Sequence, residues 1–340
     1  MIRRINIVVF AVCSVLFVSA ASQSVSIKIA TLAPEGSAWM DGMRAGAREI
    51  KERTDGRVLF KFYGGGVQGN DTAVLRKIRI GQLHGAALTG TALAERYPDL
   101  HVYGLPLMYR SLDEVNFVRK QLDETFIAGL YEHGLVSFGF AGGGFAELMS
   151  NLPVRSLDDL SGQRFWVPEG DKISAQTMRA LGVAPVTLPM TDVLTGLQTG
   201  LINIVGTSPV AAVVLQWHTK VKYATDVPLA YLVGSLVIER RVFDRLSPED
   251  QAVVREVMGR IYAEFDVQSR FDNEEAREAL VNQGIQYVPA DPAEVAQWHH
   301  IVAETRGRLA DEGVYPRERY DEVIELLEAY RASGASALAQ

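Results

Sequence analysis

The sequence is poor in cysteine, in positive charge and in long apolar runs. Its 340 residues contain a single cysteine, Cys13, and their formal net charge at pH 7 is −7. A chain with one cysteine forms no internal disulfide, and thiol catalysis is excluded once the segment that contains Cys13 is removed. The acidic balance leaves no basic surface to attract nucleic acid or anionic lipid. We therefore expect no nucleic-acid partner and no membrane-surface partner.

The first twenty residues have the pattern of a secretory signal peptide. Arg3 and Arg4 form its positive end, the stretch 5–18 is apolar, and small residues precede a cut near Ala20. About 14 apolar residues fall short of the roughly 20 that span a bilayer, which disfavours a membrane anchor. Removing residues 1–20 takes the formal charge from −7 to −9, because both arginines are lost. The pattern predicts an exported, soluble protein of the periplasm.

Alternating strand and helix patterns predict an α/β fold. Val25, Ile27 and Ile29 alternate with polar residues as in a strand, and helical spacing of apolar residues begins after Ser37, which can cap the helix. Further strand–helix units follow in the order that builds a parallel sheet covered by helices. A chain of this length exceeds one usual core and favours two lobes.

Two features indicate how the lobes are joined. The run from Ala141 to Gly144 follows a strand predicted at 135–140, interrupts the strand–helix pattern and suits a hinge, because glycine tolerates large dihedral changes. A helix capped by Ser247 has no break until about Asn282, and its ~50 Å would brace both lobes. The crossings are expected near Gly143, Tyr231 and Phe271. The predicted organisation is a signal peptide at 1–20, lobe I at 25–143 plus 231–270, lobe II at 144–230 plus 271–325, and a loose tail at 326–340.

Motifs for cofactors, metals and catalysis are weak or missing. The run Gly64–Gly69 matches the dinucleotide fingerprint in form, but no acidic residue ends the next strand and Asp71 would repel a pyrophosphate. His299 and His300 are neighbours and lack the i,i+4 spacing of a helical metal pair. We therefore expect a turn at the glycines, no cofactor, no metal and no enzyme activity, although a Ser-His-Asp site assembled in three dimensions stays open.

Several motifs in this order resemble the solute-binding proteins of tripartite ATP-independent periplasmic (TRAP) transporters, the DctP family. They are Gly66–Asp71, Leu105–Tyr109, the strand and turn from Arg164 to Gly170, and Leu197–Gly200. The resemblance implies two α/β lobes and a cleft that closes on a small organic ligand. It also implies delivery to a permease of one small and one large membrane subunit.

The charged anchors that the resemblance implies are missing. The family's main ligand-binding arginine, which precedes Val-Pro, falls at Trp166, and a second arginine falls at Ala146. An often aromatic position looks like Met190, and an asparagine before proline looks like Ser208. Arg164 lies two residues before Trp166 and could substitute, although a surface arginine is the better supported interpretation. These departures predict an apolar, aromatic or hydroxylated ligand that carries at most one weakly held acid group.

Aromatic residues near strand ends complete the predicted site. Trp39, Phe145, Trp166 and Trp217 each lie near the end of a strand or a crossing, and each alone is as compatible with lobe core as with a cleft. Acidic Glu35 maps near the same cleft. The predicted ligand contacts are Trp39, Thr89, Gly90, Thr91, Phe145, Ala146, Glu147, Arg164, Trp166, Glu169, Met190, Thr207, Ser208 and Trp217.

The favoured function is therefore a monomeric solute receptor of a TRAP transporter. A periplasmic enzyme on the same fold is one alternative, and it requires an acid–base pair or a nucleophile in the cleft. A carrier of apolar molecules that works without a permease is another. The sequence leaves the identity of the ligand, the coupling ion and the oligomeric state undetermined.

Overall fold

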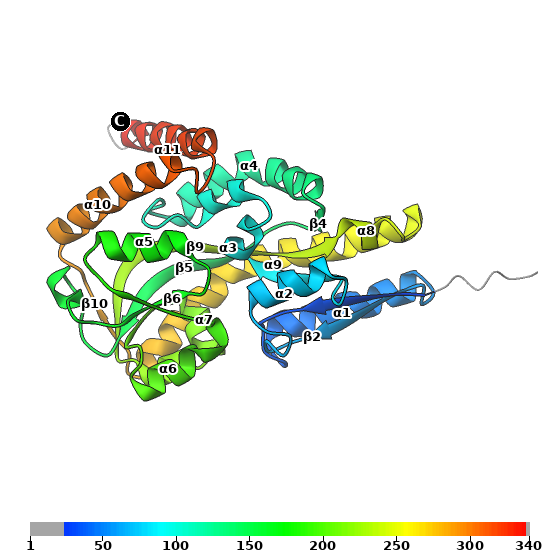
Figure 1. Ribbon diagram of the computed structural model, residues 1–340, viewed down its shortest axis with the longest axis horizontal. Helices are drawn as coiled ribbons and strands as arrows, with labels where there is room; N and C mark the ends of the chain where they lie inside the picture. Colours follow the sequence, from blue (N-terminus) through cyan, green and yellow to red (C-terminus); the bar gives the residue numbers. More distant parts are fainter. Residues whose placement is uncertain (1–23, 338–340) are drawn as a thin grey trace, which may run out of the picture.

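The computed structural model describes residues 24–337, and the expected signal peptide lies outside them. The described chain is an α/β fold around one ten-stranded sheet, in the order β2-β1-β3-β9-β5-β8-β6-β7, with β4 and β10 also paired to β9 (Figure 1). The strands are β1 Val25–Ala30, β2 Val58–Tyr63, β3 Gly85–Thr89, β4 Leu135–Ser137, β5 Ala141–Ser150, β6 Phe165–Pro168, β7 Pro185–Leu188, β8 Ile204–Thr207, β9 Tyr223–Glu239 and β10 Gln286–Val288.

Helices cover the two faces of the sheet. The α-helices are α1 Ala38–Arg53, α2 Asp71–Arg79, α3 Gly90–Ala94, α4 Leu112–Glu132, α5 Lys172–Ala180, α6 Val193–Thr199, α7 Pro209–Val214, α8 Arg240–Phe243, α9 Pro248–Asn282, α10 Pro292–Asp311 and α11 Arg317–Ala337. Short 3-10 turns occur at η1 Pro98–Tyr103, η2 Asp158–Leu160, η3 Met190–Asp192 and η4 Trp217–Lys220. None of these described helices combines the length and the apolar character of a membrane-spanning segment.

Lobe I is built on the parallel strands β1, β2 and β3, and local capping begins its helices where expected. The Ser37 hydroxyl accepts a hydrogen bond from the Met40 backbone N–H, which starts α1. The Asn70 side chain does the same for Ala73 at the start of α2. Both caps follow a strand, so each helix begins at the carboxyl edge of the sheet, where ligands bind in such folds.

Lobe II carries helices on both faces of β6, β7 and β8. Alternate residues of β6 point to opposite faces, as strand geometry requires. Phe165 packs in a core cluster with Trp298 of α10, whereas Trp166 packs in a second cluster with Val193 of α6. Helices α5 and α10 therefore cover one face of the lobe, and α6 and α7 cover the other.

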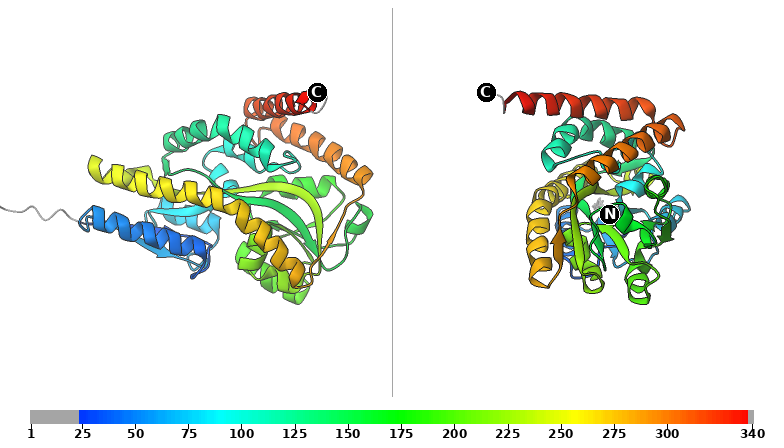
Figure 2. Two further views of the ribbon diagram at one scale, coloured as in Figure 1. Left: turned by 180° about the vertical axis from the view of Figure 1, so that it is seen from behind. Right: turned by 90° about the vertical axis from the view of Figure 1, so that its left-hand side faces the viewer.

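Two strands and one helix connect the lobes. The end of β9 pairs with β3 of lobe I, while its beginning pairs with β5 and β10 of lobe II. The 35-residue helix α9 packs on α1 in lobe I and on α7 in lobe II, and it crosses the back of the sheet in Figure 2. Its start after Ser247 and its end at Asn282 confirm the predicted long brace. The crossings expected near Gly143, Tyr231 and Phe271 fall within β5, β9 and α9, and the lobe boundaries themselves stay a prediction.

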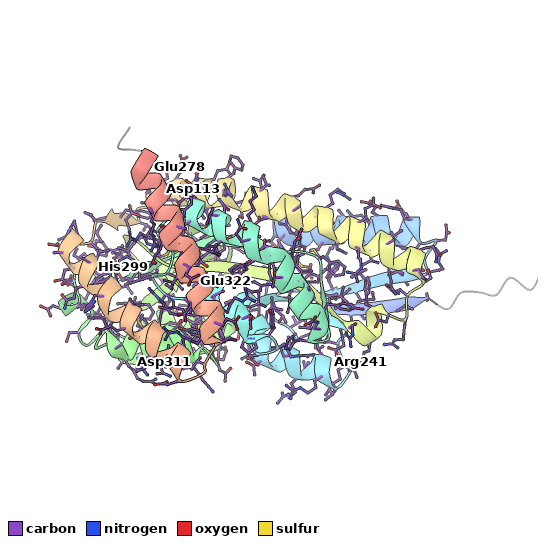
Figure 3. The ribbon with its side chains drawn as sticks, turned by 90° about the horizontal axis from the view of Figure 1, so that it is seen from above. Asp113, Arg241, Glu278, His299, Asp311 and Glu322 are labelled. Carbon is purple, nitrogen blue, oxygen red and sulfur yellow. The ribbon has the colours of Figure 1, made fainter. Side chains whose placement is uncertain are left out.

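Two segments differ from expectation. The strand expected at 135–140 ends early, as β4 at Ser137, and the glycine run from Ala141 to Gly144 itself begins strand β5. Pairing with β9 supplies its hydrogen bonds, with a register shift between Gly142 and Gly144. The loose tail expected from residue 326 is wrong as far as Ala337. Helix α11 lies over α4 there, Leu327 is buried and Arg331 forms an ion pair with Glu114 of α4 (Figure 3).

Candidate ligand-binding site

A cavity of ≈ 300 Å³ lies between the two lobes. This size falls at the lower end of small-molecule sites. Lobe I lines it around the end of β3 and the start of α2, and lobe II lines it around the ends of β6 and β8. The predicted contacts that do line it are Thr89, Gly90, Thr91, Ala146, Trp166, Glu169, Met190, Thr207 and Trp217.

The rims of the two lobes touch across the mouth of the cavity. The Asn70 amide of lobe I donates a hydrogen bond to the Glu169 carboxylate of lobe II. Gly66 approaches Thr191 so closely that a Cβ at Gly66 would lie 2.9 Å from the threonine Cγ2. A Cβ at Gly170 would lie at van der Waals distance, 3.8 Å, from the Glu95 carboxylate of lobe I. The structure therefore represents the closed arrangement of the lobes.

Lobe II supplies an apolar wall. Trp166 and Trp217 are only 4% and 3% exposed, and their rings meet edge to face with centroids 5.1 Å apart. The Trp166 indole N–H donates to the Leu188 backbone carbonyl at 3.0 Å. Because that donor is already used, Trp166 offers a ligand its ring and no hydrogen bond. Met190 continues this wall.

Lobe I supplies the hydroxyls and a buried acid. Thr89 caps α3 by accepting from the Ala92 backbone N–H, and its hydroxyl donates to the Asp71 carboxylate at 2.8 Å. Burial raises the pKa of Asp71, and the hydrogen bonds from Thr89 only partly oppose that shift. Burial also lowers the pKa of His101, so this cavity residue is kept in its neutral form. Thr91 lies beside them.

Acidic side chains line the cavity, with no lysine or arginine of the described chain among them. Asp71, Glu95, Glu169 and Asp171 line it, and no lysine or arginine of the described residues does. Asp171 is already engaged as the N-cap of α5, where it accepts from Ser174. Without a guanidinium or an ammonium, the cavity has no partner for a charged carboxylate. The chemistry favours an uncharged or electropositive ligand.

Three expected contacts lie away from the cavity for packing reasons. Trp39 stacks on Phe265 of α9, with ring centroids 5.8 Å apart, in the core beneath α1. Phe145 is absent from the cavity lining and packs edge to face against Tyr231. Ser208 is buried because its hydroxyl caps α7 and accepts from Ala211. Residues near a strand end or a turn can belong either to the core or to the ligand site, and the sequence pattern does not show which.

Two charged candidates also lie off the cavity. Glu147 forms an ion pair with Arg277 of α9 at 2.9 Å, and burial raises the pKa of this carboxyl. Arg164 is exposed and donates to the Gly200 carbonyl at 2.9 Å, just before β6 begins. It therefore does not replace the missing anchor at Trp166, and the interpretation as a surface arginine holds. Glu35 pairs with Arg44 on the surface of lobe I.

Some residues that line the cavity were not predicted from the sequence. Asn70 and Asp71 follow β2, which neighbours β1 in the parallel sheet, so the shared carboxyl edge of the strands was a usable signal. Tyr231 was treated only as a crossing, yet it lines the cavity. Trp298 of α10 also lines it, and no local pattern indicates this, because α10 reaches the cavity only through packing on α5.

Two α/β lobes that close over a cavity, joined by two strands and a long helix, define a solute-binding protein. The family model described as "Bacterial extracellular solute-binding protein, family 7" (DctP) matches residues 29–310. The chain therefore belongs to this family of bacterial extracellular solute-binding proteins.

Known relatives agree with this membership. A solute-binding protein of Sulfitobacter sp. (strain NAS-14.1) is 27% identical over 252 residues, which cover 72% of this chain and 75% of the relative. The C4-dicarboxylate-binding periplasmic protein DctP of Rhodobacter capsulatus is 21% identical over 270 residues, covering 77% and 80%. A TRAP periplasmic solute-binding protein from Xanthobacter autotrophicus Py2 with bound β-D-galacturonate has the same fold, with a TM-score of 0.80, 21% identity and coverage of 89% and 99%.

Proposed function

We propose that the protein is a monomeric periplasmic receptor that binds an uncharged apolar, aromatic or hydroxylated compound and delivers it to a TRAP permease. The permease would consist of one small and one large membrane subunit, as the resemblance implies. The ligand lies in the cavity between lobes, with its apolar body against Trp166, Met190 and Trp217. Its polar groups meet Thr89 and Thr91.

The proposed ligand class rests on one observation, the acidic lining of the cavity. The relatives named above bind acids, a C4-dicarboxylate and a galacturonate, as their names state. In this chain, no described arginine or lysine lines the cavity, and the two positions that the resemblance gives to arginine hold Trp166 and Ala146. Desolvating a carboxylate beside Asp71 and Glu95 without a cation costs several kcal/mol, on the order of a buried charge left unpaired.

Closure couples binding to delivery. A ligand favours the closed arrangement only through its greater affinity for that state. In the closed structure the rims meet through Asn70 and Glu169, so a ligand that contacts both walls holds them together. The surface formed by the closed lobes is then what the permease recognises.

The proposal is tested by a matched ligand panel. The purified chain is refolded to remove copurified ligand, and calorimetry compares succinate with 1,4-butanediol, and galacturonate with galactose. We expect no binding of either acid at millimolar concentration. Native mass spectrometry of protein that was never refolded should show a copurified ligand without an ionised acid group. Micromolar binding of either acid would contradict the proposed ligand class.

Location and partner are tested separately. Fractionation of the native host is expected to place the chain in the periplasm. Uptake of the copurified ligand should require both the receptor and the two membrane subunits. Uptake that persists without the membrane subunits would favour an apolar-molecule carrier that works alone.

A further inference from the structure

The cavity continues from the cleft into the interior of lobe II. Beyond Ala146 it is lined by the core residues that lie between β6 and the helices α5 and α10. We call this part the annex, and we define it by Leu160, Phe165, Thr177, Met178, Trp298 and Val302. No charged side chain belongs to it. The annex lies on the face of the sheet opposite the cluster that contains Trp166 and Trp217.

Helix α5 leads from the rim to the annex. Its first turn follows Gly170, which faces lobe I at the mouth. The cavity-lining residues recur at helical spacing from Ile173 through Thr177 of α5 to its C-cap residue, Leu181. At 1.5 Å per residue, this lining face extends roughly 12 Å from the rim inward. A ligand that reaches the annex from the cleft is therefore elongated.

Two buried polar atoms in the annex have no hydrogen-bond partner. They are the Thr177 hydroxyl and the Trp298 indole N–H, on residues that are 1% and 2% exposed. Buried hydroxyls and indoles nearly always find partners, so each such exception calls for an explanation. Two buried groups elsewhere have such partners, since Thr305 donates to the Ile301 carbonyl and Trp166 donates to the Leu188 carbonyl, whereas the Tyr287 hydroxyl also lacks one. The annex pair therefore differs from ordinary core residues.

We infer that the annex holds the far end of an elongated, uncharged ligand that carries an oxygen at both ends. This inference rests on the proposed function, because the near end occupies the cleft. The distal oxygen, a hydroxyl, ether or carbonyl, accepts a hydrogen bond from the Trp298 indole and meets the Thr177 hydroxyl. The apolar part in the cleft contacts the wall of Trp166, Met190 and Trp217, and the part that enters the annex lies along α5, against Met178 and Phe165. The cleft therefore favours ligands with a polar group at the near end, and the annex favours ligands that are long and carry a second oxygen at the far end.

A series of probes tests the inference. Calorimetry measures the affinities of α,ω-diols from 1,4-butanediol to 1,10-decanediol, each beside the 1-alkanol of the same length. We expect affinity to rise with length and to favour the long diol over its alkanol by about tenfold, the effect of one buried hydrogen bond. Thr177→Val and Trp298→Phe should each remove most of that preference. A crystal structure with the best diol should place an oxygen beside the Trp298 indole nitrogen.

Matched controls separate the annex from the cleft. Thr305→Val removes a buried hydroxyl that already has a partner, and Trp39→Phe changes an indole outside the cavity, so neither should alter the diol preference. Equal affinity of long diols and alkanols, or a preference that survives Thr177→Val and Trp298→Phe, overturns the inference and leaves a water in the annex. Binding of the copurified ligand without binding of any diol also overturns it. The proposed function fails separately, if neither the probes nor a copurified ligand respond to changes at Trp166.

Discussion

The two walls of the cavity differ in chemistry and in how they are held. The wall from lobe II consists of indoles and a methionine that belong to the core of the lobe, and its Trp166 N–H is already bonded. The wall from lobe I presents hydroxyls and the Asp71 carboxylate, at the start of helices α2 and α3. Lobe II therefore offers a rigid apolar surface before any ligand arrives, and lobe I adds polar contacts as the cleft closes.

This difference has a physical consequence for ligand selection. An arginine at position 166 would need solvent or a carboxylate, whereas Trp166 packs on Trp217 within a core cluster. No lysine or arginine of the described residues lines the cavity. We therefore expect the ligand to be selected by shape, desolvation and hydrogen bonding, and not by ion pairing.

Removing the indole of the lobe II wall should have the largest effect. Trp166→Ala deletes a buried side chain that both lines the cavity and packs in the core, so we expect a loss of about 3–5 kcal/mol of stability together with ligand binding. Denaturant unfolding and calorimetry measure the two losses. Trp39→Ala, outside the cavity, should lower stability and leave affinity unchanged. A Trp166→Ala protein that binds normally would show that the apolar wall is not a ligand wall.

Alanine substitutions at two neighbouring glycines test whether ligand binding requires the contact between the two lobes. Gly65 and Gly66 have φ values of 62° and 71°, so alanine strains the backbone at either position by about 1 kcal/mol. Only at Gly66 does the new Cβ meet Thr191 of the opposite lobe; at Gly65 nothing lies within 4 Å. We expect similar melting temperatures for the two variants, and about tenfold weaker ligand binding for Gly66→Ala alone. Equal affinities would mean that ligand binding does not require this closed arrangement.

The rim contact should have a smaller effect. Asn70→Asp keeps a capping side chain for α2 but places a carboxylate against Glu169. The repulsion is expected to weaken ligand binding about two- to fivefold, in line with exposed ion pairs, and to fade in high salt. Adding Glu169→Gln should restore affinity, and a titration of the double variant checks this. Failure of that rescue would place the effect of Asn70→Asp within lobe I.

Replacing Asp71, the buried acid of the lobe I wall, should have the smallest effect. We expect it to change how the melting temperature depends on pH. Burial raises the folded-state pKa of Asp71 above its unfolded value near 3.9, so the stability linked to its protonation is present at low pH and is lost as pH rises through the folded pKa. Asp71→Asn abolishes this loss. Its melting temperature relative to the parent should therefore increase as the pH rises above about 4. The exposed change Asp244→Asn serves as control, and a constant difference for Asp71→Asn would refute the assignment.

Local signals explain which parts of the fold could be predicted. The caps Ser37 and Ser247 each accept from a backbone N–H of the helix they begin, as their sequence context indicated. The end of α9 at Asn282 was also predicted. These limits depend on residues close in the sequence. The glycine run at 141–144 was expected to interrupt the strand–helix pattern, but it begins strand β5, because pairing with the distant strand β9 overrode the local preference.

The candidate site was predicted only in part, because strand alternation sets two faces without saying which one meets the ligand. On β5, Ala146 and Leu148 line the cavity while Glu147 points to Arg277 of α9. Arg164 was expected on the face of Trp166, yet β6 begins one residue later and the arginine turns to Gly200. The annex depends on α10, which is more than a hundred residues from β6 along the chain.

The sequence by itself determined the α/β class, the capped helices and the long brace, and it placed a tryptophan, Trp166, where the resemblance implies an arginine. Each of these features depends on the order and the chemical type of residues that lie close together in the sequence. Local propensity and motif spacing therefore indicate them directly. Only the tertiary structure decided which side chains share the cavity, that no described cation lines it, and that Thr177 and Trp298 are buried without partners. Those properties arise from contacts between distant segments, whose packing selects one face and one register among several that the local sequence permits.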